Sequence, residues 1–203
     1  MNADFRVQAG TLMASLLASI AADPSERFAW LPLQNEYLRS TRRYRLLRTG
    51  NQTIGKTTVA MYDLVLHAAG THPTRQSWCA EPGEYWVLCD SWAQSVIIQN
   101  KLHGVTATEL VHPQDNFEPS QGYGHKHPHV RIRHTSGAYS TIRFKTVNQR
   151  TKSLASATLK GIVADEPLPN VRVYTEAAKR IERGGWFGVC MTPINAPVEW
   201  FRE

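Results

Sequence analysis

The segment from Gly50 to Thr58 has the residue types and spacing of a phosphate-binding loop. It reads Gly50, Asn51, Gln52, Thr53, Ile54, Gly55, Lys56, Thr57 and Thr58, which fits G-x-x-x-x-G-K-[ST]. In loops of this pattern, backbone N–H groups surround the phosphates of a nucleotide, the lysine reaches the outer phosphates, and the hydroxyl after it ligates Mg²⁺. We therefore expect a P-loop in which Lys56 contacts phosphate and Thr57 holds the metal.

An acidic pair near position 165 supplies the carboxylates that such a site needs. The apolar run from Leu159 to Ala164 predicts a short buried strand that ends at Asp165 and Glu166. In P-loop enzymes one carboxylate holds Mg²⁺, usually through water, and a second can polarise the water that attacks the γ-phosphate. We assign Asp165 to the metal and Glu166 to catalysis, because glutamate at the second place suits hydrolysis.

Two further polar residues each allow two interpretations. Thr192 ends a predicted strand, where its hydroxyl could sense the γ-phosphate or satisfy its own turn. Gln34 precedes the P-loop strand, and its amide could read adenine, since it can accept from N6 and donate to N7. The alternative for Gln34 is a polar helix residue in solvent, which its residue type alone favours.

The elements around these residues come in the order that a nucleotide-binding sheet requires. Residues 44–49 form a β-compatible run before the P-loop, and an apolar face over 61–68 predicts a helix after it. A strand over 85–89 then leads into a helix that opens with a capping-box pattern at Ser91 and runs to about Leu102. Two such strand–helix units predict a parallel sheet.

The second half of the chain predicts a hairpin and one more strand. Residues 130–133 and 140–145 alternate in polarity, which indicates two half-buried strands. A helical face over 174–181, closed by Gly184, precedes a strand over 186–191. The whole pattern predicts an α/β, three-layer P-loop NTPase of the ASCE, RecA-like type, with a mainly parallel central sheet flanked by helices.

Basic and histidine-rich segments leave more than one interpretation open. Five arginines between positions 39 and 48 could line a nucleic-acid path, pair with phosphate or form a solvated helix end, and the last is favoured. The Arg and Lys residues of the hairpin would share one face, toward a polyanion or toward water. The histidines at 125, 127 and 129 lack Cys or carboxylate partners at ligand spacing, so a polar surface loop is favoured over a metal site.

Composition bounds the class of protein. The chain has 203 residues, 42% of them hydrophobic and 20% charged, which suits one well-buried soluble domain. Its net charge of +6 favours contact with a polyanion, and its three cysteines argue against a disulfide framework and for a reducing setting. Residues 8–22 predict an amphipathic helix too short to span a bilayer, so we expect an N-terminal helix or lid over 1–27 and an ATPase domain over 28–203.

Taken together, these motifs resemble the ATPase domain of the large terminase subunit of tailed bacteriophages, the motor that packages DNA into an empty capsid. The resemblance covers roughly residues 28–201. It rests on an ordered set of segments: Gln34, Gly50 to Gln52 with Gly55 to Thr58, Trp86 to Leu88 with Ser91, Ser140 to Phe144, Asp165 to Pro167, Arg180 with Gly184 and Gly185, and Met191 to Pro193.

The resemblance implies a function and a set of residue roles. It implies that hydrolysis of ATP with Mg²⁺ drives translocation of double-stranded DNA into a procapsid. The implied partners are a portal protein and a small terminase subunit, with a homo-oligomeric ring on the procapsid, a monomer in isolation and no membrane contact. The implied location is the cytoplasm of the infected host, not the mature virion. Gln34 becomes an adenine contact, Glu166 the catalytic carboxylate and Thr192 the residue that couples hydrolysis to domain movement.

Two features depart from the family pattern. Many relatives carry an arginine inside the P-loop, where Gln52 and Thr53 stand here. We therefore expect an arginine finger from a neighbouring subunit, with Arg150 as the first candidate and Arg180 as the second. Large terminases also continue into an RNase H-like nuclease domain, and none follows here, so we expect either an isolated ATPase domain or a nuclease elsewhere.

Two other functions share these motifs. The ATPase core of a helicase or repair enzyme has the same plan, but a helicase needs a second RecA-like domain, for which we expect no room in this chain. A non-hydrolytic assembly module would use ATP only to hold subunits together. Magnesium-dependent phosphate release above that of a Lys56→Ala control would exclude this module.

Overall fold

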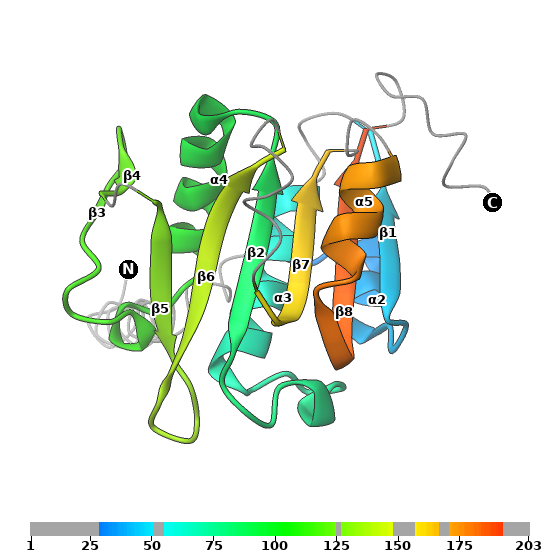
Figure 1. Cartoon of the computed structure of the whole chain (residues 1–203), viewed down its shortest axis with the longest axis horizontal. Helices are drawn as coiled ribbons and strands as arrows, with labels where there is room; N and C mark the ends of the chain where they lie inside the picture. The colour runs from blue at the N-terminus through cyan, green and yellow to red at the C-terminus, as the bar shows by residue number, and fades with distance from the viewer. Residues whose placement is uncertain (1–28, 51–54, 125–126, 148–156, 167–170, 193–203) are drawn as a thin grey trace, which may run out of the picture.

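The structure is a computed structural model of the chain, and it describes residues 29–50, 55–124, 127–147, 157–166 and 171–192 (Figure 1). The helices are α2 (Pro32–Arg39), α3 (Lys56–Ala69), α4 (Trp92–Gly104) and α5 (Val171–Ala178), with 3-10 turns η2 (Gln76–Trp78) and η3 (Thr108–Leu110). The strands are β1 (Tyr44–Arg48), β2 (Glu84–Cys89), β3 (Phe117–Glu118), β4 (Gly122–Tyr123), β5 (His129–Arg133), β6 (Tyr139–Thr146), β7 (Leu159–Asp165) and β8 (Ile181–Met191). None of these helices is both long enough and apolar enough to cross a membrane. The helix expected over 8–22, and with it the segment 1–27, lies outside the described residues.

Six strands form the main sheet in the order β1-β8-β7-β2-β6-β5. All neighbouring strands are parallel except β5 and β6, which pair antiparallel as the expected hairpin. The prediction of a mainly parallel sheet is therefore confirmed. Because parallel strands end at the same edge, the residues that follow β1, β2, β7 and β8 all lie along one edge of the sheet.

Helices cover both faces of this sheet, which is the middle of three layers (Figure 1). On one face, α3 and α4 pack over a core that includes Tyr85 and Val87 of β2. On the other face, α5 packs over a second core that includes Trp86 and Leu88 of the same strand. Since successive side chains of a strand point to opposite faces, β2 is buried on both sides and its sequence is almost continuously apolar.

Helices α3 and α4, which begin at the carboxyl edge, have the ends that their sequences indicate. Helix α3 ends at Ala69, and Gly70 follows it in the left-handed conformation, with φ 74°. Helix α4 begins after Ser91, whose Oγ accepts a hydrogen bond from the Gln94 N–H at 3.2 Å. The cap at Ser91 fixes the first turn of α4 beside the end of β2.

The predicted boundary between the last helix and the last strand is wrong. Helix α5 ends at Ala178, and Ile181 already belongs to β8. Ile181 pairs with Leu159 of β7 and is buried, so pairing and burial in the sheet outweigh its helical spacing. Gly184 does not close a helix. With φ 89° it lies inside β8, where the pairing register with β7 shifts.

Candidate functional site

Gly50, Gly55 and the first turn of α3 form the described part of the predicted P-loop. Gly55 has φ 61°, in the left-handed region that favours glycine, and it directly precedes Lys56. The unpaired backbone N–H groups at the start of a helix favour an anion such as phosphate. Asn51, Gln52, Thr53 and Ile54 lie outside the described residues.

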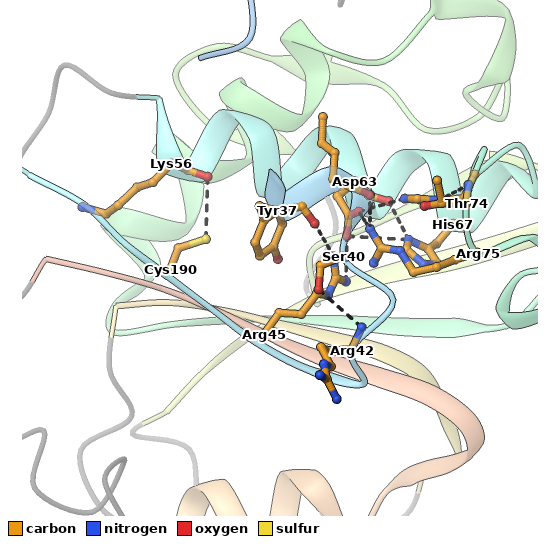
Figure 2. Close-up of polar contacts among 12 residues, drawn as sticks. Tyr37, Ser40, Arg42, Arg45, Lys56, Asp63, His67, Thr74, Arg75 and Cys190 are labelled. Carbon is orange, nitrogen blue, oxygen red and sulfur yellow. Dashed lines mark hydrogen bonds and ion pairs between the residues drawn. The ribbon is translucent and has the colours of Figure 1, made fainter. Parts of the chain in front are cut away.

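Lys56 extends from the start of α3 toward the ends of β7 and β8. Its Nζ lies 3.1 Å from Glu166 Oε1 and donates a hydrogen bond to Thr192 Oγ1. Its backbone oxygen accepts from Cys190 Sγ at 3.6 Å (Figure 2). The P-loop lysine therefore contacts both the expected catalytic carboxylate and the expected coupling residue.

Thr57 and Asp165 form the pair that the sequence assigns to Mg²⁺. Thr57 Oγ1 donates to Asp165 Oδ1 at 2.7 Å, and both side chains are buried. Burial raises the pKa of Asp165, while the hydrogen bond from Thr57 opposes this shift. A hydroxyl and a carboxylate side by side offer the oxygen ligands that Mg²⁺ prefers, so the residues present fit the metal.

Glu166 follows β7 in a backbone conformation that is rare for a residue with a side chain. Its φ is 75°, and the described part of the chain contains no other non-glycine residue with positive φ. Its N–H donates to Cys190 O at 2.7 Å, and its carboxylate accepts from the Thr192 N–H at 3.1 Å. The side chain is 35% exposed. Strained backbone of this kind is concentrated at functional sites, which supports a role for Glu166 in chemistry.

Helix α4 contributes two polar side chains to the site, Gln94 and Lys101, that are not part of the nucleotide-binding motifs. Gln94 Nε2 donates to Asp165 Oδ2 at 3.2 Å, and its Oε1 accepts from the Asp90 N–H at 2.9 Å. Lys101 lies two turns further along α4 and lines the same pocket. The capping-box pattern at Ser91 is the sequence signal for Gln94, because it places residue 94 in the first turn of a helix that begins at the carboxyl edge.

One pocket at the carboxyl edge of the sheet is lined by the described P-loop residues, the acidic pair and residues of α4. Its lining residues are Gly50, Gly55, Lys56, Thr57, Gln94, Ile97, Ile98, Lys101, Asp165 and Glu166. Thr57 and Asp165 are 108 positions apart in the sequence and are in direct contact here. The residues predicted for phosphate, metal and catalysis therefore share one space.

Gln34 lies beside the P-loop, in the first turn of α2. Its side chain is buried, and its Oε1 accepts from the Leu31 N–H at 2.7 Å. A Cβ added to Gly55 would lie 3.1 Å from Gln34 Nε2, so the amide packs against the P-loop backbone. The alternative that placed Gln34 in solvent is therefore wrong. Its role as an adenine contact stays a prediction.

Of the two candidate arginine fingers, Arg180 lies in the described part of the chain. Arg150 lies outside the described residues. Arg180 directly precedes β8, and its Nη2 lies 3.5 Å from Glu176 Oε2. Since β8 reaches the pocket only at its other end, at Met191, Arg180 is at the opposite edge of the sheet from the pocket of its own chain.

One arginine of the predicted basic cluster is not at the surface. Arg45 is 6% exposed, and its Nη2 lies 2.9 Å from Asp63 Oδ2 of α3. Its guanidinium also lies over the rings of Tyr37 and Trp186, at 4.7 and 4.5 Å. A solvated or DNA-facing position is therefore wrong for Arg45, because the alternation of β1 turns this side chain inward.

Two basic side chains on the predicted hairpin face have acidic partners in the same chain. Arg131 Nη2 lies 2.6 Å from Oδ1 of the buried Asp115, and Arg143 Nε lies 3.1 Å from Glu84 Oε1. These ion pairs hold the hairpin to neighbouring segments. They favour a structural role for these two cations over contact with a polyanion.

Comparison with known proteins identifies the fold through solved structures. No protein-family model and no curated protein matches the chain. The large terminase ATPase domain of Thermus phage P74-26 aligns with a TM-score of 0.56 and 21% identity, over 86% of this chain and 68% of that chain. The large terminase of a thermophilic bacteriophage aligns with a TM-score of 0.62 and 16% identity, over 86% of this chain and 42% of that chain.

A second structure of this same thermophilic-bacteriophage terminase, in complex with ADP, aligns with a TM-score of 0.57 and 16% identity. The match covers 80% of this chain and 39% of that chain, so this chain spans less than half the length of the longer neighbours. The predicted α/β P-loop NTPase fold is confirmed, and the chain has the fold of a large terminase ATPase domain.

Proposed function

We propose that this chain is the ATPase motor domain of a viral DNA-packaging terminase large subunit, which hydrolyses Mg-ATP to drive double-stranded DNA into a procapsid. One observation carries the proposal. Lys56, Thr57, Asp165, Glu166 and Thr192 converge at one edge of the sheet. Hydrogen bonds and an ion pair join Lys56, Glu166 and Thr192, and a hydrogen bond joins Thr57 to Asp165. The bacteriophage large terminases that share this fold, one of them in complex with ADP, support the assignment.

Each of these side chains has a distinct task in hydrolysis. Thr57 and Asp165 would hold Mg²⁺, which neutralises charge on the phosphate oxygens when bound. Lys56 donates to the outer phosphates and stabilises the charge of the transferred phosphoryl group. Glu166 orients the attacking water and accepts its proton, so that the new bond from the water oxygen to phosphorus forms as the β–γ bridging bond breaks.

The contacts of Lys56 indicate how nucleotide binding would prepare Glu166. The Lys56 ammonium group lies 3.1 Å from the Glu166 carboxylate. The phosphates of ATP carry more negative charge and compete for the same ammonium group, so their binding would release Glu166 to contact water. Thr192 Oγ1 is hydrogen-bonded to both Lys56 and Glu166, so its contacts would change when Lys56 moves from Glu166 to phosphate. This supports Thr192 as the coupling residue.

The larger assembly belongs to the same proposal. In this proposal the chain forms a homo-oligomeric ring on a procapsid in the cytoplasm of the infected host. The ring would bind a portal protein, a small terminase subunit and double-stranded DNA. Arg150 of one subunit would complete the site of the next. The phage terminase neighbours support this setting through the fold that they share with the chain.

Substitution of Glu166 tests the catalytic assignment. Glu166→Gln keeps the shape of the side chain but removes the base, so we expect ATP binding close to that of the wild type. Phosphate release should fall by about 10²- to 10⁴-fold, the usual contribution of a positioned acid–base group. Lys56→Ala is the control, since it should weaken nucleotide binding as well.

Two results would contradict the proposal. Wild-type phosphate release by Glu166→Gln would show that another group orients the water. Magnesium-dependent phosphate release by the wild type that never exceeds the Lys56→Ala background would indicate a non-hydrolytic ATP-binding module instead.

A further inference from the structure

A buried cluster of ionisable side chains surrounds the middle of α3, two turns from the pocket residues Lys56 and Thr57, and hydrolysis as described above does not use it. Asp63 of α3 is fully buried at its centre (Figure 2). Arg45 Nη2 lies 2.9 Å from Asp63 Oδ2, Arg75 Nη2 lies 2.5 Å from Oδ1, and His72 Nε2 lies 3.1 Å from Oδ1. His67 lies one turn further along α3, with Nδ1 2.8 Å from Asp63 O. We call these five residues the Asp63 cluster.

The two arginines of the Asp63 cluster also bind the C-terminal end of α2. Arg75 Nη2 donates to Leu38 O at 2.8 Å, and Arg45 Nη1 donates more weakly to Tyr37 O at 3.5 Å. Both carbonyls belong to the last turn of α2, at the negative end of the helix dipole, where Tyr37 O otherwise accepts only a long hydrogen bond of 3.4 Å from the Ser40 N–H. Asp63 balances the two positive charges, so the cluster ties the end of α2 to the middle of α3.

The other end of α2 carries Gln34, which packs against Gly55 of the P-loop. Helix α2 therefore meets the P-loop helix at two places, directly through Gln34 and indirectly through the carbonyls held by the Asp63 cluster. The helix has only eight residues. Because an α-helix rises 1.5 Å per residue, fixing its last turn fixes the position of Gln34 only one turn away.

We propose that the Asp63 cluster positions Gln34 against the nucleotide base and so sets a preference for adenine over guanine nucleotides. This rests on the function proposed above. Adenine offers a donor at N6 and an acceptor at N7, whereas guanine offers acceptors at both O6 and N7, so a fixed glutamine amide discriminates between them. Such discrimination requires the amide to be held within about 0.5 Å of its productive position. Arg75 is thus a positioning residue that acts through α2.

A metal site is the alternative for this cluster, and its charges oppose it. Ligand atoms of Asp63, His67 and His72 lie within 4.8 Å of one another. Both carboxylate oxygens, however, already accept hydrogen bonds from guanidinium groups. Two adjacent positive charges would repel a cation, so the carboxylate serves to balance the arginines.

Arg75→Lys is the variant that separates positioning from charge balance. Lysine keeps a positive charge beside Asp63, but its nitrogen is one bond closer to the backbone and does not reach both Asp63 and Leu38 O. Arg131→Lys is the matched control, because Arg131 of β5 also pairs with a buried aspartate, Asp115, and β5 lies at the end of the sheet opposite β1. Where Arg75→Lys does not fold by circular dichroism, Arg45→Lys takes its place.

Equilibrium binding of ATP, GTP and inorganic tripolyphosphate to the full chain tests the proposal. Tripolyphosphate reports on the P-loop alone, since it has no base. We expect Arg75→Lys to weaken ATP binding about tenfold, to leave tripolyphosphate binding unchanged and to remove the preference for ATP over GTP. Gln34→Ala should give the same loss, and the double variant should lose no more than either single one, since both act through one contact. Arg131→Lys should bind all three probes as the wild type does.

Three results would overturn the proposal, and each has a different meaning. An unchanged ATP preference in Arg75→Lys, with Gln34→Ala impaired, would show that the Asp63 cluster does not position Gln34. Equal weakening of ATP and tripolyphosphate would show general damage to α3. An unchanged ATP preference in Gln34→Ala would remove the adenine contact while leaving the proposed ATPase intact. Failure of the wild type to bind either ATP or tripolyphosphate would instead refute the nucleotide-dependent function itself.

Discussion

Asp165 accepts a hydrogen bond at each of its carboxylate oxygens, from Thr57 on one side and from Gln94 on the other. Thr57 belongs to the P-loop pattern, whereas Gln94 belongs to none of the nucleotide-binding patterns. Loss of a hydrogen-bond partner that orients a metal-ligating carboxylate commonly lowers metal affinity by about 10- to 100-fold. Gln94 therefore affects the site through the geometry of Asp165.

This role predicts a specific change in magnesium dependence. We expect Gln94→Ala to raise the Mg²⁺ concentration for half-maximal ATP hydrolysis about tenfold, because the Asp165 carboxylate loses one of its two fixed partners. A magnesium titration at saturating ATP measures this. Ser91→Ala is the control, since it removes the cap of α4 and leaves the Gln94 side chain in place. An equal shift in both variants would show that the start of α4 matters and the Gln94 amide does not.

At the scale of elements, α3 links the pocket to the Asp63 cluster. Lys56 and Thr57 occupy its first turn, and Asp63 and His67 lie two and three turns further along. Burial lowers the pKa of His67 to about 3, against the attraction of Asp63. Burial also acts to raise the pKa of Asp63, but Arg45, the histidines and Arg75 together lower it below its ordinary value.

These shifts predict that the fold loses stability in mild acid. The folded state binds a proton at His67 more weakly than the unfolded chain, where the ordinary pKa is 6.5. The contribution of His67 to the free energy of unfolding is therefore complete above about pH 6.5 and is lost as the pH falls toward 3. His67 alone should lower the free energy of unfolding by about 2 kcal/mol between neutral pH and pH 5. Asp63 adds to the loss only below about pH 4.

Urea unfolding at pH 7.5 and pH 5 checks this expectation. His67→Gln, which does not titrate, should show a smaller difference between the two midpoints than the wild type. The same difference in both proteins would assign the acid sensitivity to other groups.

The sequence predicts the features that depend on a few adjacent residues. It does not predict contacts that depend on how distant elements pack together. Lys56, Thr57 and Asp165 follow from motif spacing, because loop and strand chemistry at each place is set by a few adjacent residues. Arg45 looks like a surface arginine in sequence, since its buried partner Asp63 comes from a different element. Ile181 has helical spacing in the sequence but pairs with Leu159 in the sheet. This pairing depends on where β7 lies, which the local sequence does not show.

At the scale of the whole molecule, the pocket is open at the carboxyl edge and is lined by residues of one chain. Its cations among the described lining residues are Lys56 and Lys101. An arginine in the transition state contributes about 10³- to 10⁵-fold to the rate in related phosphoryl-transfer enzymes. A subunit arranged in a ring could receive this group from its neighbour, and Arg150 is our first candidate.

This arrangement predicts that ATP hydrolysis depends on assembly. We expect the rate per subunit to rise with protein concentration and with double-stranded DNA, because both bring neighbouring subunits together. Arg150→Ala should abolish the rise without weakening ATP binding. Arg180→Ala is the comparison, since it removes the second candidate. A low rate that is independent of concentration, DNA and both substitutions would show that neither arginine completes the site.

Glu166 also has a consequence for how this protein would respond to selection. Its left-handed backbone costs a residue with a side chain about 1 to 2 kcal/mol, and glycine would adopt it freely. A library screened only for folded protein should therefore enrich glycine at position 166. The same library screened for ATP turnover should retain glutamate. The disagreement between the two screens would mark Glu166 as a residue at which stability is given up for activity.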